Sequence, residues 1–550
     1  MKIALAQYNY HIGNLPANVA KIKEGISRAK REGADIVVFS ELSLCGYPPK
    51  DLLLHNGFIT ACENAINDIA KECIGVAAII GAPARNLKHE GKSLFNAAFF
   101  LADGKIIAQV NKTLLPFYDV FDEYRYFEPA EENKQIEYKG VNIALTVCED
   151  VWNERPLNDR YLYKQSSLEK LCTAKTNCII NIAASPFSYI HPEERKQMFE
   201  TASSHYKLPF FYVNALGANT ELIFDGGSMV VTSKGVIDEL DYCKEDFSVY
   251  ELAPDNTVKI INPKKHQNPE KYIERIYNAL ILGIKDYFGK NNLTSAVLGL
   301  SGGIDSAIVL VLAAEALGAN NVHPIMLPSK YTSQESIDDA MALAKNVGCD
   351  YESIFIEDGV AAVNTSLTKA FTGKKADITE ENIQSRMRAI MLMAVSNKMG
   401  YLLLNTSNKS ELATGYGTLY GDMSGAISVL GDVYKTQVYA LANYINSIKP
   451  GLIPANIISK PPTAELKPNQ KDSDSLPEYD ILDKVLYQYI ELEKSPSDIT
   501  VKGADAALIK RITDMVNRNE FKRQQAPPIL RVSPKAFGPG RRMPIVAKYL

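Results

Sequence analysis

The decapeptide LGLSGGIDSA, residues 298–307, joins two apolar runs and decides the fold of the second half of the chain. Residues 296–298 suit a buried strand, and residues 307–310 suit the first turn of a buried helix. A glycine-rich turn between a strand and a helix presents backbone N–H groups to a phosphate. The common nucleotide-binding loop ends in Gly-Lys-Ser or Gly-Lys-Thr, but this stretch contains no lysine. It therefore predicts a phosphate site built from backbone and hydroxyl groups.

Strand and helix patterns alternate on both sides of this loop. A helix beginning at residue 272 leads into a strand at 294–299, and further strands are predicted at 321–327, 351–356 and 400–404. Long amphipathic stretches separate them. This alternation predicts a doubly wound, largely parallel sheet of Rossmann-like organisation.

The first half also reads as α/β, but with a mixed sheet. A helix is predicted over residues 14–31, with Asn14 as its cap and Pro16 in its first turn. The residues Ala-Asp-Gly between 94–101 and 105–110 predict a hairpin. Buried strands are predicted at 2–8, 35–40, 76–82, 141–147, 178–183 and 209–214.

Two polar segments interrupt the apolar periodicity. Proline, asparagine and lysine accumulate in 252–270, so we predict domains at 1–251 and 272–550 joined by a linker over 252–271. The second segment, ELKPNQKDSDSLPEYD at 465–480, is polar and broken by proline. We predict that it forms a mobile surface loop.

The composition excludes several classes of function. The chain has 550 residues, of which 46% are hydrophobic and 23% are charged, as in a multidomain globular protein. The net charge of −4 offers no general attraction to nucleic acid or to anionic membranes. No apolar run is long enough for a membrane span, and the polar start disfavours a signal peptide. The eight cysteines show no CxxC spacing, so we expect a reducing cytoplasm and no zinc site.

Three reactive side chains in the first half each follow an apolar run directly: Glu41, Lys112 and Cys148. Each alone has an ordinary explanation, either a buried thiol or a solvated charge. Together they suit amide hydrolysis. A carboxylate can deprotonate a thiol that attacks a carbonyl carbon, and an ammonium with a backbone N–H can stabilise the resulting oxyanion. The constellation therefore predicts hydrolysis through a thioester.

The stretches VVFSELSLCGYPPKD, VNKTLLPFYDVFDEYRYF and IALTVCEDVW, in this order, resemble the Glu-Lys-Cys triad of the nitrilase and amidase superfamily. The resemblance covers about residues 1–250 and implies an α-β-β-α sandwich that hydrolyses carbon–nitrogen bonds. It makes Glu41 the general base, Lys112 the oxyanion-side ammonium and Cys148 the nucleophile.

The glutaminase branch of that superfamily implies glutamine as the amide. Tyr118 and Ser185, the latter in AASPFSYIHPEERKQ, match the tyrosine and serine that hold the substrate there. Many relatives have a lysine six residues after the serine, where this sequence has His191. We expect His191 to contact glutamine, and Arg195 is a nearby cation that could share the role.

The loop of the second half resembles the SGGxDS motif of the ATP pyrophosphatases, which split ATP between the α- and β-phosphates. No lysine is needed because the γ-phosphoryl group is not transferred. An ionised Asp305 beside phosphates makes sense as a magnesium ligand. The ATP-binding residues that follow from the motif and from the end of strand 400–404 are Gly299, Leu300, Ser301, Gly302, Gly303, Ile304, Asp305, Ser306 and Thr406.

Segments 381–436, 459–480 and 520–528 resemble NAD synthetases, and together with the first half they resemble the glutamine-dependent NAD synthetase family. The resemblance implies ATP-dependent amidation of deamido-NAD with ammonia from glutamine, the last step of NAD biosynthesis. ATP would be the co-substrate, and Mg²⁺ would bind Asp305 and Glu411. The deamido-NAD-binding positions would be Asn382, Glu411 and Lys522, and Asp422 and Lys435 are further candidates in the same half.

Alternatives stay open at the level of the sequence. The SGGxDS loop also occurs in other glutamine-dependent ATP pyrophosphatases, such as GMP synthetase, which would carry a different amidotransferase half. A nucleotide sensor without catalysis would have lost the triad or Asp305, and both are intact. We expect small-molecule substrates, a homo-oligomer, a cytoplasmic location, and neither nucleic acid nor membrane as partner. Since ammonium cannot attack a carboxyl group, a protected route for ammonia is expected.

Overall fold

The computed structural model describes residues 1–154, 160–266, 268–269, 271–468 and 470–548. The chain divides into two compact units, Met1–Glu270 and Lys271–Leu550. Within the described residues, no helix is both long and apolar enough to cross a membrane.

The first unit contains two large sheets. A seven-stranded sheet has the order β15-β14-β1-β2-β3-β4-β5, and a six-stranded sheet has the order β13-β12-β9-β8-β7-β6. The strands of the first sheet are β1 (Lys2–Gln7), β2 (Ile36–Val38), β3 (Ala77–Arg85), β4 (Leu94–Ala102), β5 (Lys105–Asn111), β14 (Asp246–Leu252) and β15 (Val258–Ile260). Those of the second are β6 (Ile136–Tyr138), β7 (Val141–Val147), β8 (Cys178–Ala183), β9 (Phe210–Asn214), β12 (Met229–Thr232) and β13 (Gly235–Glu239). A separate ribbon pairs β10 (Leu216–Asn219) with β11 (Leu222–Asp225).

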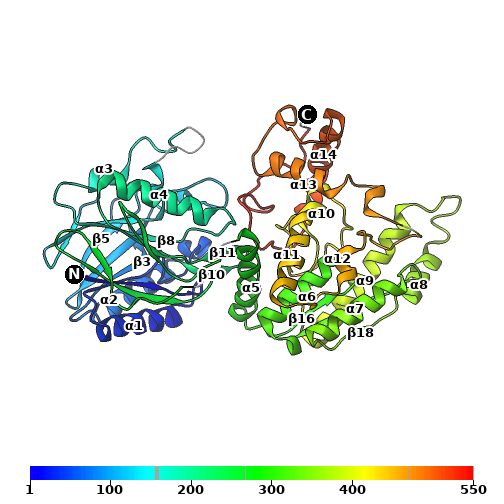
Figure 1. Ribbon diagram of the computed structural model, residues 1–550, viewed down its shortest axis with the longest axis horizontal. Coiled ribbons are helices and arrows are strands. Elements are labelled where there is room, and N and C mark those ends of the chain that lie inside the picture. Colours follow the sequence, from blue (N-terminus) through cyan, green and yellow to red (C-terminus); the bar gives the residue numbers. More distant parts are fainter. Residues whose placement is uncertain (155–159, 267, 270, 469, 549–550) are drawn as a thin grey trace. The chain divides into compact units, whose positions relative to one another are not determined.

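The two sheets form the middle of a four-layer sandwich. Along β1, Ile3 and Leu5 lie in the core between the sheets, whereas Ala4 and Ala6 face the outer helices, as the two-residue period of a strand requires. Helices α1 (Leu15–Arg31) and α2 (Asn56–Ala70) cover one side, and α4 (His191–Tyr206) covers the other (Figure 1). Short helix α3 (Ser167–Leu171) lies beside α4 in the same view. The predicted α-β-β-α architecture is confirmed.

The local predictions for this unit are largely confirmed. The Asn14 side chain accepts a hydrogen bond from the backbone N–H of Ala17 at the start of α1. Strands β4 and β5 pair antiparallel, as the hairpin signal indicates. The linker prediction is wrong in part, because β15 lies inside 252–271 and pairs with β14. Val258 and Ile260 pack against the core between the sheets, although charged neighbours hide their apolar alternation in the sequence.

The second unit is built on one parallel sheet with the order β18-β17-β16-β19-β20. Its strands are β16 (Ala296–Gly299), β17 (Val322–Met326), β18 (Glu352–Ser353), β19 (Leu402–Asn405) and β20 (Ile427–Ser428). The strand order reverses at β16, between β17 and β19. The carboxyl ends of strands at such a switch point border the ligand crevice of doubly wound folds. The predicted doubly wound sheet is confirmed, although β18 is shorter than the predicted strand at 351–356.

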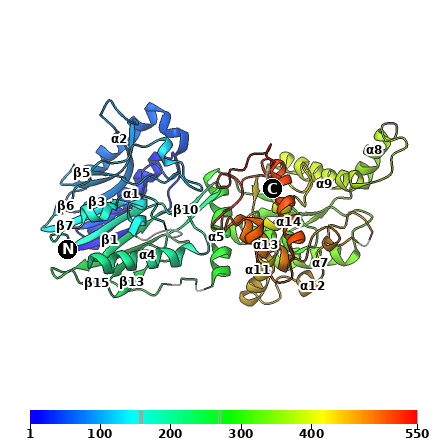
Figure 2. The ribbon, with the colours of Figure 1, turned by 90° about the horizontal axis from the view of Figure 1, so that it is seen from above.

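Helices cover both faces of this sheet. Helix α6 is buried over most of its length, as expected for its apolar sequence. Helix α9 covers the opposite face through Met387, which packs with Val297 and Leu403, and α8 lies at its far end (Figure 2). The helices are α5 (Tyr272–Lys290), α6 (Ile304–Leu317), α7 (Gln334–Val347), α8 (Glu357–Leu367), α9 (Ile378–Met399), α10 (Lys409–Thr414), α11 (Lys435–Ile448), α12 (Ala455–Ser459), α13 (Tyr479–Ile490), α14 (Ala506–Arg518) and α15 (Glu520–Arg523).

The segment 465–480, predicted to be a mobile surface loop, is largely exposed in its described part, which excludes residue 469, but two of its residues lie in the interior. Asp472 and Leu476 are buried. The carboxylate of Asp472 accepts hydrogen bonds from the hydroxyls of Tyr416 and Tyr479, at 3.2 and 3.0 Å. The polar segment therefore includes an interior carboxylate, and one of its two partners, Tyr416, lies elsewhere in the chain.

Candidate active sites

Glu41 follows β2 and is held in the interior of the first unit. A neighbouring strand reaches it closely at Gly81, where a Cβ atom would lie only 2.2 Å from the backbone nitrogen of Leu42. Glycine is therefore required there by close backbone approach. The Oε2 atom of Glu41 accepts a hydrogen bond from the backbone N–H of Ala184 at 2.8 Å.

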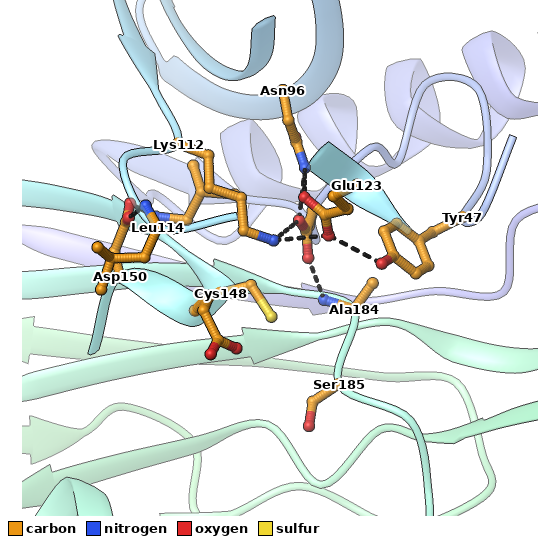
Figure 3. Close-up of polar contacts among 12 residues, drawn as sticks. Tyr47, Asn96, Lys112, Leu114, Glu123, Cys148, Asp150, Ala184 and Ser185 are labelled. Atoms are coloured by element: carbon orange, nitrogen blue, oxygen red, sulfur yellow. Dashed lines mark hydrogen bonds and ion pairs between the residues drawn. The ribbon is translucent and has the colours of Figure 1, made fainter. Parts of the chain in front are cut away.

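Lys112 lies at the centre of a buried charge cluster (Figure 3). Its Nζ atom donates to Oε1 of Glu41 at 2.8 Å and to Oε1 of Glu123 at 2.7 Å. Asn96 donates to both carboxylates, and the Tyr47 hydroxyl donates to Glu123. The ammonium and both carboxylates are almost completely removed from solvent.

Burial and charge act against each other in this cluster. Burial disfavours the charged form of Lys112, but the carboxylates of Glu123 and Glu41 outweigh it and hold the lysine pKa well above its usual value. Burial also raises the pKa of Glu123, and the Lys112 ammonium only partly offsets that effect. The cluster therefore holds a permanent cation beside a carboxylate that has little contact with water.

We expect Lys112→Met to lower the free energy of unfolding by about 3–5 kcal/mol, because it leaves two buried carboxylates without a cation. Urea unfolding followed by tryptophan fluorescence measures this, since the single tryptophan, Trp152, lies in the first unit. The matched control is Lys139→Met, which removes a largely exposed pair with Asp35 and should stay within about 1 kcal/mol of the unchanged chain. Equal effects of the two substitutions would contradict the assigned charge cluster.

Cys148 is the first residue after β7, and its backbone has a φ of 43°. This left-handed conformation is unfavourable for a residue with a side chain, and such strain is common at reactive positions. Figure 3 shows its side chain in the same part of the unit as Lys112 and Ala184. Burial and the Glu41 carboxylate raise the pKa of the thiol well above its usual value, although Lys112 opposes this. The resting group is therefore a thiol, which needs a base to become a nucleophile.

Asp150 fixes the relation between β7, which ends just before Cys148, and the segment that follows Lys112. Its Oδ1 atom accepts from the backbone N–H groups of Thr113 and Leu114, both at 2.8 Å, and its Oδ2 accepts from Val147 at 3.0 Å. A buried carboxylate that bridges three backbone amides braces both segments against each other.

Glu149 is a second buried carboxylate next to the thiol. Tyr118 donates to both of its oxygens, at 3.0 and 3.1 Å, and Tyr163 donates to Oε1 at 3.0 Å. Burial raises the pKa of Glu149 to about 7, because these hydroxyls and Lys112 only partly offset the loss of water. Tyr118, which is predicted to bind the substrate glutamine, is thus positioned by this carboxylate.

The other residues predicted to bind glutamine, Ser185 and His191, lie between the end of β8 and the start of α4. Ser185 is held through its backbone N–H, which donates to Oδ1 of Asn214 at 2.9 Å. His191 begins α4, and its Nδ1 lies 3.0 Å from the carbonyl oxygen of Pro186. Arg195, the cation suggested to share the contact with glutamine, is already paired inside the protein. Its guanidinium is fully buried and binds both carboxylate oxygens of Asp225, so the charge is already neutralised.

The phosphate loop of the second unit lies between β16 and α6, as predicted. The Ser301 and Ser306 hydroxyls are 3.1 Å apart, and the backbone N–H of Gly303 donates to Ser301 Oγ at 3.2 Å. Gly302 has a φ of 78°, and a Cβ atom there would lie 2.2 Å from the Ser336 carbonyl oxygen. The loop is therefore tightly folded, with its hydroxyls gathered at the amino end of α6.

A cavity of about 300 Å³ opens beside this loop. Its wall includes Thr406 after β19, Glu411 of α10 and Asp422, together with all predicted ATP-binding residues except Gly302. Strand ends on both sides of the switch point thus contribute to one cavity. Residues 463–466 and Asp472 also line it, which the sequence does not indicate.

Asp305, Glu411 and Lys435 form a charge cluster in this wall. The Lys435 ammonium contacts Oδ2 of Asp305 and lies 3.6 Å from Oε1 of Glu411. Burial and the Asp305 carboxylate raise the pKa of Glu411 to about 8, and Lys435 offsets this in part. One ammonium therefore serves two carboxylates that come together from distant parts of the chain.

Asn382 and Lys522 do not line the cavity. Asn382 accepts a hydrogen bond from the Thr418 hydroxyl at 2.8 Å. Lys522 donates to the carbonyl oxygens of Gly415 and Gly417, both at 2.8 Å, and burial lowers its pKa. Both residues therefore hold the segment 415–418, which follows α10 directly and contributes Tyr416 to the cavity wall.

Sequence reasoning missed several members of these sites. Glu149 directly follows Cys148, so its position next to the nucleophile was the available signal. Glu123 and Asp472 lie in polar stretches without a distinctive spacing, and only the fold brings them inward. Asn408, which donates to Asp305 at 2.9 Å, precedes α10 as an ordinary cap would.

Known families match both units of the chain. Residues 2–256 match the carbon-nitrogen hydrolase family, and residues 276–526 match the NAD synthase family. The glutamine-dependent NAD(+) synthetase of Synechocystis sp. is 41% identical over 554 residues, which cover 100% of this chain and 99% of that protein. The enzyme of the same name from Thermotoga maritima is 39% identical over 583 residues, with 100% and 99% coverage.

Solved structures agree with these matches. The glutamine-dependent NAD+ synthetase of Acinetobacter baumannii, solved with adenosine diphosphate, is 36% identical, with a TM-score of 0.78 and coverage of 99% of this chain and 98% of that chain. The synthetase of Cytophaga hutchinsonii shares the fold at 20% identity, with a TM-score of 0.84 and coverage of 100% and 98%. Identity that extends over the whole length of both partners leaves no unit unassigned. The chain therefore belongs to the glutamine-dependent NAD(+) synthetase family.

Proposed function

We propose that this chain converts deamido-NAD into NAD, with ATP and with ammonia released from glutamine. The products are NAD, glutamate, AMP and pyrophosphate, and the reaction is the last step of NAD biosynthesis. One observation carries the proposal: Asp305, Thr406 and Glu411 line a single cavity with the SGGIDS loop. The same chain holds Glu41, Lys112 and a buried thiol in its other unit.

In the first unit, the Cys148 thiol attacks the amide carbon of glutamine while Glu41 accepts the thiol proton. The raised pKa of Cys148 supports this order, because a thiol that is protonated at rest requires a base at the moment of attack. Lys112 and the backbone N–H of Glu149 stabilise the oxyanion. Glu41 returns the proton to the departing ammonia, and water then cleaves the thioester to glutamate. Tyr118, Ser185 and His191 hold the substrate.

In the second unit, the carboxylate of deamido-NAD attacks the α-phosphorus of ATP, and pyrophosphate leaves. Ammonia then attacks the carbonyl carbon of the acyl-adenylate, and AMP leaves. The loop from Gly299 to Ser306 holds the phosphates with backbone N–H groups and the end of α6. Thr406 contacts ATP from β19, and Lys435 is a further cation in the same wall. Glu411 binds deamido-NAD from the cavity wall, and Asn382 and Lys522, which lie outside the cavity, bind it beside the segment 415–418.

The donor set beside the loop fits Mg²⁺. Asp305 and Glu411 offer carboxylate oxygens, which this ion prefers together with substrate phosphates. One ammonium, that of Lys435, faces both carboxylates, so the pair keeps a net negative charge when both are ionised. When bound, the ion would neutralise charge on the departing pyrophosphate. Asp305 and Glu411 would hold it.

The family resemblance further implies a homo-oligomer in the cytoplasm, with deamido-NAD, ATP and glutamine as its small-molecule partners. Size-exclusion chromatography with light scattering measures the oligomeric state. A monomer at micromolar concentration would contradict the oligomer without affecting the assigned chemistry.

The experiment that tests the proposed function compares two acceptors, deamido-NAD and xanthosine monophosphate, with glutamine, ATP and Mg²⁺ supplied. We expect NAD, AMP and pyrophosphate in equal amounts with deamido-NAD, and no product with xanthosine monophosphate. Amination of xanthosine monophosphate would assign the chain to a different ATP pyrophosphatase reaction. Binding of ATP and deamido-NAD without pyrophosphate release would instead indicate a nucleotide sensor.

A further inference from the structure

Asn408 lies where two distant segments of the second unit meet. It directly precedes α10, the helix that carries Glu411, and its side chain is completely buried. Asp305 belongs to α6, 103 residues earlier in the chain, and the two side chains are hydrogen-bonded. Asn408 therefore joins the ends of the elements that follow β16 and β19, the two central strands of the switch point.

Three hydrogen bonds define the position of this residue. Its Oδ1 accepts from the backbone N–H of Glu411 at 3.0 Å, and its own backbone N–H donates to Oε2 of Glu411 at 3.2 Å. This reciprocal pair is a capping box. The remaining group, Nδ2, donates to Oδ1 of Asp305 at 2.9 Å. The side-chain amide of Asn408 thus contacts the Asp305 carboxylate and the backbone of Glu411, and the backbone N–H of Asn408 holds the Glu411 carboxylate.

Lys435 cannot perform this task alone. Its ammonium lies between Oδ2 of Asp305 and Oε1 of Glu411, on a long side chain with many rotamers. An asparagine amide is short and planar, and here both its ends are engaged inside the protein. It therefore fixes the carboxylate of Asp305 with Oδ1 toward Asn408 and Oδ2 toward Lys435.

We infer that Asn408 is a positioning residue for the ATP-dependent step. By holding Asp305 through Nδ2 and Glu411 through the capping box, it presents both carboxylates to the phosphate loop as one preformed ligand pair. This inference rests on the proposed Mg²⁺ site. A metal site whose ligands are oriented by neighbouring hydrogen bonds binds its ion more tightly than the same ligands left free.

The substitution Asn408→Ser distinguishes the positioning of Asp305 from ordinary helix capping. A serine hydroxyl is a good cap acceptor, but it is too short to replace an amide that reaches Asp305. Alanine removes both functions. The experiment measures Mn²⁺ binding to the full-length chain in the presence of α,β-methylene-ATP, by electron paramagnetic resonance of free Mn²⁺, together with the thermal unfolding midpoint.

We expect Asn408→Ser and Asn408→Ala both to weaken Mn²⁺ binding by about tenfold, the factor that corresponds to a hydrogen bond to a charged group. Only Asn408→Ala should also lower the unfolding midpoint clearly. The matched control is Asp505→Ala. The Asp505 side chain caps α14 by accepting a hydrogen bond from the backbone N–H of Leu508 at 2.8 Å, and the substitution removes this cap. It should lower the midpoint and leave Mn²⁺ binding unchanged.

Two results would overturn the inference, and they are distinguishable. If Asn408→Ser binds Mn²⁺ like the unchanged chain while Asp305→Asn binds it weakly, Asn408 is only a cap and the metal proposal stands. If Asp305→Asn binds Mn²⁺ as well as the unchanged chain, the proposed metal site itself is wrong. A rise in the Mg²⁺ concentration for half-maximal pyrophosphate release, with kcat recovering at saturating Mg²⁺, supports positioning.

Discussion

Cys148→Ala should abolish NAD formation from glutamine and leave NAD formation from added ammonium salts close to that of the unchanged chain. Removal of a covalent nucleophile lowers its reaction by at least about three orders of magnitude. The second unit contains its own cavity and its own charged groups, so it needs only ammonia from the first. The rates are measured as NAD formed per minute with ATP and deamido-NAD, with glutamine or an ammonium salt as nitrogen source.

Cys178→Ala is the matched control for this substitution. That cysteine is also buried in the first unit, in β8, but it is remote from the charge cluster in the sequence and carries no proposed chemistry. It should retain both activities. Equal loss of the glutamine-dependent and ammonium-dependent rates in Cys148→Ala would refute the assigned division of labour.

Asp305→Asn should abolish NAD formation with either nitrogen source, by at least about a hundredfold, because the carboxylate that we propose holds Mg²⁺ becomes a neutral amide. The substitution keeps the shape of the side chain but removes the charge that faces Lys435. Pyrophosphate release with ATP, deamido-NAD and an ammonium salt measures the effect without any contribution from the first unit.

Asp514→Asn provides the comparison for this prediction. Asp514 lies on α14, where it accepts from Lys510 at the helix surface, and it does not line the cavity. Its rates should equal those of the unchanged chain. Retention of ammonium-dependent pyrophosphate release in Asp305→Asn would show that the phosphate loop acts without this carboxylate.

Local sequence was sufficient to predict most of the fold. In the turn between β16 and α6, Gly302 lies where another backbone segment approaches closely. A Cβ atom on Gly302 would lie 2.2 Å from the carbonyl oxygen of Ser336. Strand β1 alternates between two cores, and its period of two residues is visible in the chain itself. Strand β15 was missed because three residues within a charged segment carry too little pattern.

The environment of each reactive group could not be predicted in the same way. Lys112 was expected beside a base, but its second carboxylate, Glu123, lies on a short helical turn with no motif that marks it as a partner of the lysine. Arg195 was expected near the substrate, whereas Asp225 neutralises it in the interior. Which charges are paired depends on contacts between residues far apart in the chain, and no local pattern encodes them.

The sequence by itself predicted many of the strands and helices, the phosphate loop, and Glu41, Lys112, Cys148 and Asp305 as candidate site residues, because these predictions depend on local periodicity, short motifs and a family resemblance. Only the tertiary structure decided the protonation and orientation of those groups. Burial raises the pKa of Cys148, and a single buried amide, Asn408, links Asp305 to the helix of Glu411. Desolvation and long-range hydrogen bonds exist only once the chain has folded, so these properties belong to the structure.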